Sequence, residues 1–345
     1  MSTAVRIDNV SIVFGSDAAR ALPLMDEGQD RREIQAATGQ VLGVHNCTID
    51  VEEGEILVLM GLSGSGKSTL LRAVNGLNPI ARGSVSVTDG GTMVNVTQAN
   101  TAALRRLRMH HISMVFQQFG LLPWRTVREN VGLPLELSGE KSAEAAPRIE
   151  AQLALVGLAD WADRKVGELS GGMQQRVGLA RAFVTEAPIL LMDEPFSALD
   201  PLIRTKLQDE LLDLQRQLRR TIIFVSHDLD EAFKLGNKIA IMEGGRIVQA
   251  GTPQDIYRAP TNDYVADFIK HMNPLGVLRA RDLMQPVNSE AQGTLPADTL
   301  IKDGMDRLIG ATHPIGVEED GALIGQLSKD DLLTGLARGS GVSTE

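Results

Sequence analysis

The pattern of apolar and polar residues predicts short strands that alternate with helices along most of the chain. Val5–Phe14 alternates between apolar and polar positions and is rich in β-branched residues, which favours a strand. Apolar runs at Glu55–Met60, Ile189–Asp193 and Thr221–Ser226 predict three more strands, and each borders a stretch with helical character. Such an alternation is typical of a mostly parallel sheet. The sequence therefore predicts an α/β fold.

Two segments interrupt this alternation. Residues 16–43 are polar and charged, with a short helix expected at Arg31–Ala37, and we interpret them as a solvated surface insertion. Residues 117–180 are largely helical in character, since apolar residues recur in them at helical spacing. We expect this second segment to form a helical lobe inserted into the sheet domain.

A second, smaller α/β unit is predicted at the end of the chain. A polar stretch ends near Asn273 and Pro274, so residues 1–272 would form the first domain and residues 278–338 the second, called the tail below. The expected elements of the tail are two strands, His313–Glu318 and Ala322–Gln326, and two helices, Ile301–Leu308 and Lys329–Ala337.

Charge and composition exclude several classes of protein. The chain has 34 Lys and Arg against 44 Asp and Glu, a formal net charge of -10, which argues against nucleic acid as a partner and leaves no polybasic arm for anionic lipid. Cys47 is the single cysteine, so no internal disulfide is possible and we expect its side chain to act as a small buried hydrophobic group. A reducing cytosol fits this cysteine content. No secretory signal is recognisable, and no apolar run approaches the roughly 18 residues of a membrane-spanning helix. We expect a chain that does not cross a membrane by itself.

The segment Gly61–Ser68, called the glycine loop below, fits the phosphate-binding pattern G-x-x-x-x-G-K-[ST] between a predicted strand and a predicted helix. Its glycines let backbone N–H groups converge on phosphate oxygens, and Lys67 brings positive charge to the β- and γ-phosphates. The hydroxyl of Ser68 is positioned to bind Mg²⁺. The residues expected to contact the nucleotide here are Gly61, Ser63, Gly64, Ser65, Gly66, Lys67, Ser68 and Thr69.

Two carboxylates, Asp193 and Glu194, stand at the end of the strand Ile189–Asp193. Ligands of open α/β sheets bind at the carboxyl ends of the strands, so Asp193 suits the coordination shell of a metal. Glu194 suits the activation of an attacking water. Adjacent acids at a strand end could also be a solvated turn, but the presence of the glycine loop favours the chemical interpretation.

Three further residues follow or end predicted strands. Gln117 comes after Ile112–Phe116, and its amide can ligate Mg²⁺ and orient a water, although an isolated glutamine is more often a surface residue. His227 follows Thr221–Ser226, where an imidazole can hold the γ-phosphate or the water. Phe14 ends the first strand and either stacks on an adenine or packs in the core.

A second phosphate-binding pattern occurs in Leu169–Gln175 (LSGGMQQ), called the signature segment below. Its serine can cap a helix, and its glycines let the backbone approach an anion closely. Because the glycine loop already holds phosphates, this segment must serve a nucleotide elsewhere, most simply on a second copy of the chain. The residues expected to face that nucleotide, or to lie where two copies meet, are Ser170, Gly171, Gly172, Gln174 and Asp200.

Together these motifs resemble the ATPase subunits of ABC transporters, over roughly Val5–Ile269. Six elements in the family's order carry the resemblance: the Walker A loop Gly61–Ser68, the Q-loop Gln117, the signature Leu169–Gln175, the Walker B strand with Glu194, the D-loop Ser197–Asp200 and the switch His227. The resemblance implies a P-loop NTPase with a RecA-like core, an inserted helical lobe and an antiparallel β edge. It also implies that ATP and Mg²⁺ are bound between the two subunits of a homodimer.

A closer resemblance is to the ATP-binding subunits of quaternary-amine importers, those for glycine betaine, proline and choline. It rests on the insertion at residues 16–43, on Phe116–Val127, and on the tail after Leu278, which is similar to a CBS module. This resemblance implies import through transmembrane permease subunits, with a periplasmic or lipid-anchored solute-binding protein as an indirect partner. The chain would lie peripherally on the cytoplasmic face of the bacterial inner membrane.

The tail departs from this pattern, since it has room for about one CBS module where the glycine betaine transporters carry two. Acidic residues outnumber basic ones in the tail, so a cationic surface that senses ionic strength is not supported. Pairing of two chains and binding of a regulatory nucleotide both stay open for it. The alternative functions are import of another small solute and, in a different class, a soluble ABC-type ATPase that acts on ribosomes or DNA.

Overall fold

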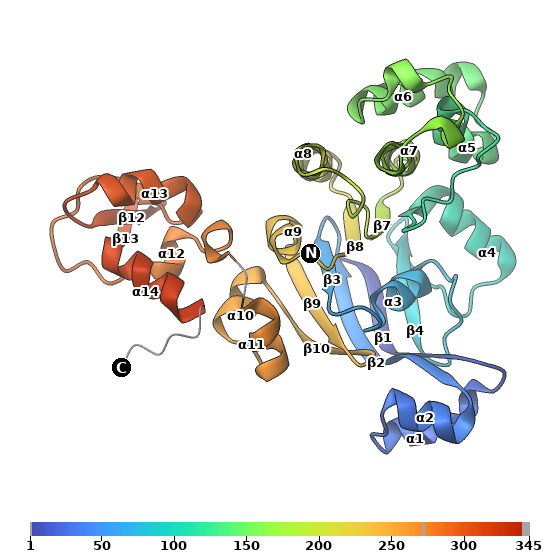
Figure 1. Cartoon of the computed structure of the whole chain (residues 1–345), viewed down its shortest axis with the longest axis horizontal. Coiled ribbons are helices and arrows are strands. Elements are labelled where there is room, and N and C mark those ends of the chain that lie inside the picture. The colour runs from blue at the N-terminus through green and yellow to red at the C-terminus, as the bar shows by residue number, and fades with distance from the viewer. Residues whose placement is uncertain (1, 271–272, 340–345) are drawn as a thin grey trace. The chain divides into compact units, whose positions relative to one another are not determined.

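The computed structural model describes residues 2–270 and 273–339, which form two compact units (Figure 1). The first unit extends to His227 and includes Ala240–Val248. The second comprises Asp228–Ile239 and the chain from Gln249 onward. The boundary predicted at residue 272 therefore lies inside the second unit, because the helices that precede it group with the tail.

A six-stranded sheet in the order β10-β9-β3-β8-β7-β6 carries the glycine loop and the two carboxylates. The strands β3, β8, β7 and β6 are parallel neighbours, as predicted, and every residue of β3, β7 and β8 is buried. Such continuous apolar strands are expected where both faces of a parallel sheet are covered. The bounds are β3 Ile56–Met60, β6 Ile112–Val115, β7 Ile189–Asp193, β8 Thr221–Val225, β9 Lys238–Glu243 and β10 Arg246–Gly251.

The antiparallel strands of the first unit form a second sheet, in the order β2-β1-β4-β5. Alternate residues of its long strands are apolar and belong to the main core of this unit. The strand predicted at Val5–Phe14 corresponds to β1, whereas β4 and β5, which are half exposed and mixed in polarity, were not predicted. The bounds are β1 Thr3–Phe14, β2 Val41–Glu52, β4 Arg82–Asp89 and β5 Thr92–Asn95.

The insertion at residues 16–43 is more ordered than the sequence analysis expected. It contains the helices α1 (Leu22–Asp26) and α2 (Arg31–Thr38), the second of which matches the predicted helix. Much of its surface is exposed, but Met25 and Ile34 are fully buried in a small core of their own against β1 and β2. The insertion is therefore a packed element and not only a solvated one.

Helices complete the first unit. The lobe consists of α5, α6 and α7, which pack on one another (Figure 1); a Cβ added to Gly132 of α5 would lie 2.7 Å from Ile149 of α6, so these two helices approach closely. A short π-helical turn, Leu107–His111, follows α4. The bounds are α3 Lys67–Val74, α4 Thr101–Arg106, α5 Val127–Ser138, α6 Ser142–Leu155, α7 Gly171–Phe183 and α8 Pro201–Leu218.

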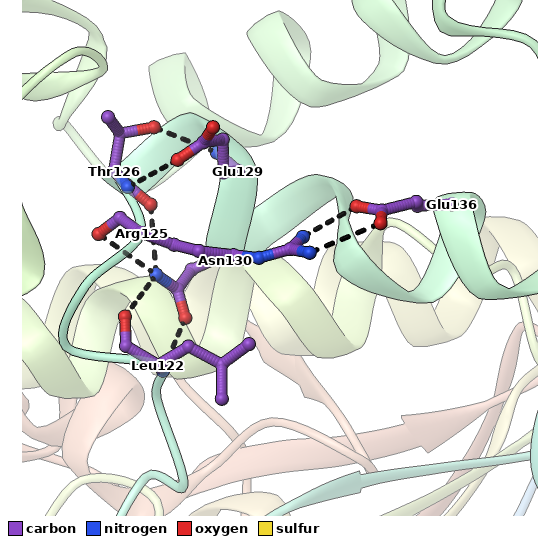
Figure 2. A network of polar contacts seen from close by, with 6 residues as sticks. All are labelled: Leu122, Arg125, Thr126, Glu129, Asn130 and Glu136. Carbon is purple, nitrogen blue, oxygen red and sulfur yellow. Dashed lines mark hydrogen bonds and ion pairs between the residues drawn. The ribbon is translucent and has the colours of Figure 1, made fainter.

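Polar contacts fix the chain where it enters the lobe (Figure 2). The fully buried amide of Asn130 accepts a hydrogen bond from the backbone N–H of Leu122 at 2.8 Å and donates to the carbonyl of Thr126 at 2.9 Å. Thr126 caps α5 in a reciprocal arrangement with Glu129. The loop before α5 is thus held in one conformation by the first turn of the helix that follows it.

The second unit contains its own sheet, in the order β11-β12-β13, with the helices α13 and α14 and a separate apolar core. The predicted strands and helices of the tail are confirmed, and β11 is added to them. The resulting β-α-β-β-α order is compatible with a CBS-like module, which stays a prediction. The bounds are α9 Leu229–Leu235, α10 Pro253–Arg258, α11 Asp263–Ile269, α12 Ala280–Leu283, β11 Thr294–Pro296, α13 Ile301–Gly310, β12 Ile315–Glu319, β13 Ala322–Leu327 and α14 Lys329–Gly339.

Within the described ranges, none of the helices combines the length and the apolar character that crossing a membrane requires.

Candidate functional site

The glycine loop connects β3 to α3, at the carboxyl end of the parallel sheet. Its first and third glycines are required by space and by backbone conformation. A Cβ at Gly61, whose φ is +139°, would lie 2.2 Å from the carbonyl oxygen of Met242. A Cβ at Gly66, whose φ is +103°, would lie 2.7 Å from the carbonyl oxygen of Gly43. The loop is therefore compact enough to wrap around a phosphate only with these residues.

Lys67 opens α3 and is almost fully buried. Its ammonium donates hydrogen bonds to the carbonyl oxygens of Gly61 at 2.8 Å and of Leu62 at 3.0 Å, which holds the charge inside the loop. Burial lowers the pKa of Lys67, whereas the nearby carboxylates of Glu194 and Asp193 raise it. The loop thus presents one fixed positive charge where the anion of a nucleotide would lie.

Ser68 and Asp193 lie side by side between the loop and β7. The Ser68 hydroxyl donates to the Asp193 carboxylate at 2.6 Å, and the guanidinium of Arg72 donates to the other carboxylate oxygen at 2.9 Å. Asp193 is fully buried, so these two contacts compensate its charge. Two hard oxygen donors at this spacing fit Mg²⁺, which takes oxygen ligands from one or two carboxylates together with substrate phosphates.

Glu194 follows β7 in the left-handed region, with a φ of +50°. Such a conformation is sparsely populated by glutamate and clusters at functional sites. Its carboxylate accepts a hydrogen bond from the Gln117 amide at 3.2 Å and lies 3.6 Å from Nδ1 of His227. The imidazole of His227 is 63% exposed. The structure therefore brings together the three side chains that were predicted at the ends of β6, β7 and β8.

A cavity of about 320 Å³ opens beside the glycine loop. Phe14 lies at its edge and is 38% exposed, which favours a binding role over a core role. Of the residues predicted in the glycine loop and at the strand ends, Gly61, Ser65, Asp193 and His227 are not in its lining. The lining consists of Phe14, Arg31, Val41, Leu42, Gly43, Ser63, Gly64, Gly66, Lys67, Ser68, Thr69, Gln117 and Glu194.

The signature segment does not line this cavity. Ser170 caps α7 by accepting a hydrogen bond from the backbone of Met173. The Gln174 amide donates to the carbonyls of Val166 and Leu169, so it stabilises its own segment. Asp200 caps α8. In one copy of the chain, Ser170 and Gly171 are thus exposed at a helix N-terminus, outside the lining of the cavity, whereas Leu169 at the start of the segment is buried.

Three residues of the site were missed by the sequence analysis. Arg72 compensates the buried charge of Asp193. Gln175 is buried, and its amide joins the carbonyl of Glu194 to the backbone N–H of Ala198 at 3.2 Å and 3.0 Å. Arg31 reaches the cavity from the insertion. Only Gln175 lies within a recognised motif; the contact of Arg31 with Gly64 spans 33 residues of sequence, and that of Arg72 with Asp193 spans 121.

The glycine loop after β3, the buried aspartate at the end of β7 and the neighbouring glutamate define a P-loop nucleotide-binding site on an α/β sheet. Comparisons with known proteins narrow this class. The family described as "ABC transporter" matches residues 44–197. The glycine betaine/proline betaine transport system ATP-binding protein ProV of Escherichia coli (strain K12) is 42% identical over 348 residues, 99% of this chain and 85% of that protein.

Two further similarities agree in class. The trimethylamine N-oxide transport system ATP-binding protein TmoW of Ruegeria pomeroyi is 42% identical over 347 residues, and the match covers 98% of both chains. A solved dimeric post-hydrolysis state of the ATP-binding cassette MJ0796, bound to ADP and Pi, has a TM-score of 0.62 at 29% identity and covers 72% of this chain and 98% of that one. The chain belongs to the ATP-binding proteins of ABC transporters. The predicted family, ATPase activity and P-loop fold are confirmed.

Proposed function

We propose that this chain is the ATP-hydrolysing subunit that energises import of a quaternary amine through a membrane permease. The observation that carries the proposal is the near-full-length similarity to ProV and TmoW, whose names specify glycine betaine/proline betaine and trimethylamine N-oxide transport. All three named solutes carry a methylated nitrogen centre, so this chemistry defines the substrate class.

Binding of the nucleotide is assigned to the glycine loop. Lys67 and the loop amides, with Ser63, Ser65 and Thr69, contact the phosphates, and Phe14 contacts the base. Mg²⁺, when bound, would compensate charge on the β- and γ-phosphates, held by Ser68, Asp193 and Gln117. The oxygen donors of Ser68 and Asp193, 2.6 Å apart, support this assignment.

Hydrolysis is assigned to the residues around Glu194. Its carboxylate orients and polarises the attacking water, and the imidazole of His227 contacts the γ-phosphate when the site is closed. Because this chemistry depends on positioning and charge stabilisation, Glu194→Gln should lower ATP turnover by roughly a hundredfold or more while ATP still binds. Rapid hydrolysis by that variant would contradict the role given to Glu194.

The second half of the site is assigned to another copy of this chain. Ser170, Gly171, Gly172 and Gln174 would face the partner's nucleotide, and Asp200 would lie near the contact between the copies. Exposure of Ser170 and Gly171, outside the cavity of their own chain, supports this arrangement. The similarity to a dimeric cassette points the same way.

Contact with the permease is assigned to the lobe, on the cytoplasmic face of the inner membrane. The loop fixed by Asn130 exposes 69% of Trp124, an unusual amount for a large apolar side chain on an ordered segment. Trp124→Ala should reduce coupled transport more than the ATP turnover of the isolated subunit. A solute-binding protein would deliver the amine to the permease and would not touch this chain.

The experiment that tests the substrate class is uptake of labelled choline, glycine betaine, proline betaine and trimethylamine N-oxide by a strain that lacks this chain. Expression of the chain should restore uptake of at least one of these solutes, and the Glu194→Gln variant should not. Restored uptake of an unrelated solute alone would overturn the substrate class. Normal uptake of all solutes without the chain, and no permease co-purifying with it, would overturn the transport role.

The tail is proposed to be a single CBS-like module that pairs two chains. Deletion of residues 275–345 should then weaken dimer formation without altering the affinity for ATP. If the tail instead binds a regulatory nucleotide, the full chain should bind a second nucleotide that the shortened chain does not bind. Equilibrium dialysis of both chains separates these two outcomes.

A further inference from the structure

Arg31, the first residue of α2, connects the insertion to the glycine loop. Its guanidinium donates hydrogen bonds from Nη1 to the carbonyl oxygen of Gly64 and from Nη2 to that of Gly43. A glycine leaves the space for it, because a Cβ at Gly245 would lie 3.0 Å from Nη2. The guanidinium therefore fills a backbone-lined site and also forms part of the cavity wall.

An ordered element holds Arg31 in this position. The side chain of Asp30 caps α2, and Glu33 bonds back to the backbone of Asp30, so the first turn is fixed at both ends. One turn later, Ile34 is fully buried against Met25 and the strands β1 and β2. The insertion thus delivers a positive charge to the nucleotide site from a helix that is anchored independently.

Among the described residues, no carboxylate forms an ion pair with Arg31. Arginine has five N–H donors, and its Nε is buried without a hydrogen-bond partner in that part of the chain. Burial lowers the pKa of Arg31, which reflects the cost of holding its charge away from water. A half-buried cation with an unused donor is stabilised by an anion, and guanidinium groups bind phosphate oxygens well.

We propose that Arg31 is a nucleotide-binding residue supplied by the insertion, with its guanidinium contacting the phosphate chain of the bound nucleotide. The cavity wall then carries two cations, Lys67 on the glycine loop and Arg31 opposite its Gly64 carbonyl. The insertion becomes part of the ATP site, and its packing on β1 and β2 is what sets the position of that second charge. This inference rests on the nucleotide site proposed above.

The test is the affinity for ATP, ADP and adenosine, measured by equilibrium dialysis on the full chain. Arg31→Ala should weaken ATP and ADP about tenfold or more, a change of about 1.4 kcal/mol, and leave adenosine unchanged. Arg32→Ala is the matched control, because Arg32 is the next residue of the same helix and is exposed. It should bind all three ligands as the unchanged chain does.

Two further measurements separate a phosphate contact from a structural contact. Arg31→Gln removes the charge but keeps an N–H donor for the carbonyls, so it serves if Arg31→Ala does not fold, and it should show the same loss for ATP. The dependence of ATP affinity on salt should become shallower in both Arg31 variants and not in Arg32→Ala. Equal loss for adenosine and ATP, or an unchanged salt dependence, would show that Arg31 only ties α2 to the loop.

The failure of this inference and the failure of the nucleotide site give different results. Lys67→Ala should abolish measurable ATP binding if the glycine loop is the nucleotide site. If Lys67→Ala binds ATP normally, the site itself is wrong. If Lys67→Ala fails to bind and Arg31→Ala binds as the unchanged chain does, only the role of Arg31 is overturned.

Discussion

Replacing Asp193 by asparagine should destabilise the fold even without nucleotide. Besides facing the proposed metal position, Asp193 accepts hydrogen bonds from Ser68 and Arg72. Its fully buried carboxylate accepts hydrogen bonds from the Ser68 hydroxyl at 2.6 Å and from Arg72 at 2.9 Å. Asparagine keeps the shape and one acceptor but removes the charge and presents an NH₂ group to one donor. The side chain of Arg72 is 38% exposed and can rehydrate, so we expect a loss of about 2–3 kcal/mol.

The neighbouring change Glu194→Gln is the matched control, since it removes one charge one residue away. The Glu194 carboxylate is 20% exposed, and its partners Gln117 and His227 lie at 3.2 Å and 3.6 Å. We expect a change within about 0.5 kcal/mol for this variant. Urea titration of both variants, followed by circular dichroism, gives the comparison. Equal stability of the two variants would refute the reasoning, because burial and close partners would then make no difference.

Three more predictions concern buried groups. The guanidinium of Arg181 donates hydrogen bonds to the carbonyls of Phe119 and Gly120. Arg181→Ala should therefore loosen the segment after Gln117, lower the free energy of unfolding by about 1–3 kcal/mol and lower ATP turnover. A stable, fully active variant would refute this. Burial lowers the pKa of His45. Its neutral form therefore stabilises the fold at pH values above the ordinary pKa of about 6.5, and this stabilisation is lost as the pH falls through the lower pKa of the folded state. His45→Gln should flatten the acid limb of a curve of unfolding free energy against pH, and an unchanged limb would contradict this. Burial raises the pKa of Cys47 to about 11. Iodoacetamide at pH 8 should therefore modify the thiol of the folded chain far more slowly than that of the urea-unfolded chain. Equal rates would be evidence against burial of the thiol.

The parts of the fold and of the site that the sequence predicts are those determined by local sequence patterns. The glycine loop, Glu194 and His227 follow apolar strands of five residues, and the edge of a parallel sheet brings such strand ends together. The element limits of β7 and of the tail helices agree with the sequence pattern because period and flanking residues determine them locally.

Long-range packing accounts for what the sequence did not predict. The strand β4, which pairs with β1, alternates over only two buried positions, Val85 and Val87, and β5 has no buried residue, so neither gives a strong local signal. Arg31 stands in a polar helix whose pattern indicates only exposure, and its role depends on the fold bringing α2 to the glycine loop. The grouping of Gln249–Ile269 with the tail likewise depends on tertiary contacts, which composition does not encode.

The central claim is that each ATP site needs the glycine loop of one copy and the signature segment of another. Mixing two inactive variants tests it most directly: Lys67→Ala removes the loop cation, and Ser170→Arg obstructs the signature segment. A mixed dimer contains one composite site with both halves intact and one with both halves altered. The mixture should therefore hydrolyse ATP well above either variant alone. A mixture as inactive as its components would contradict it, because both halves would then have to come from the same chain.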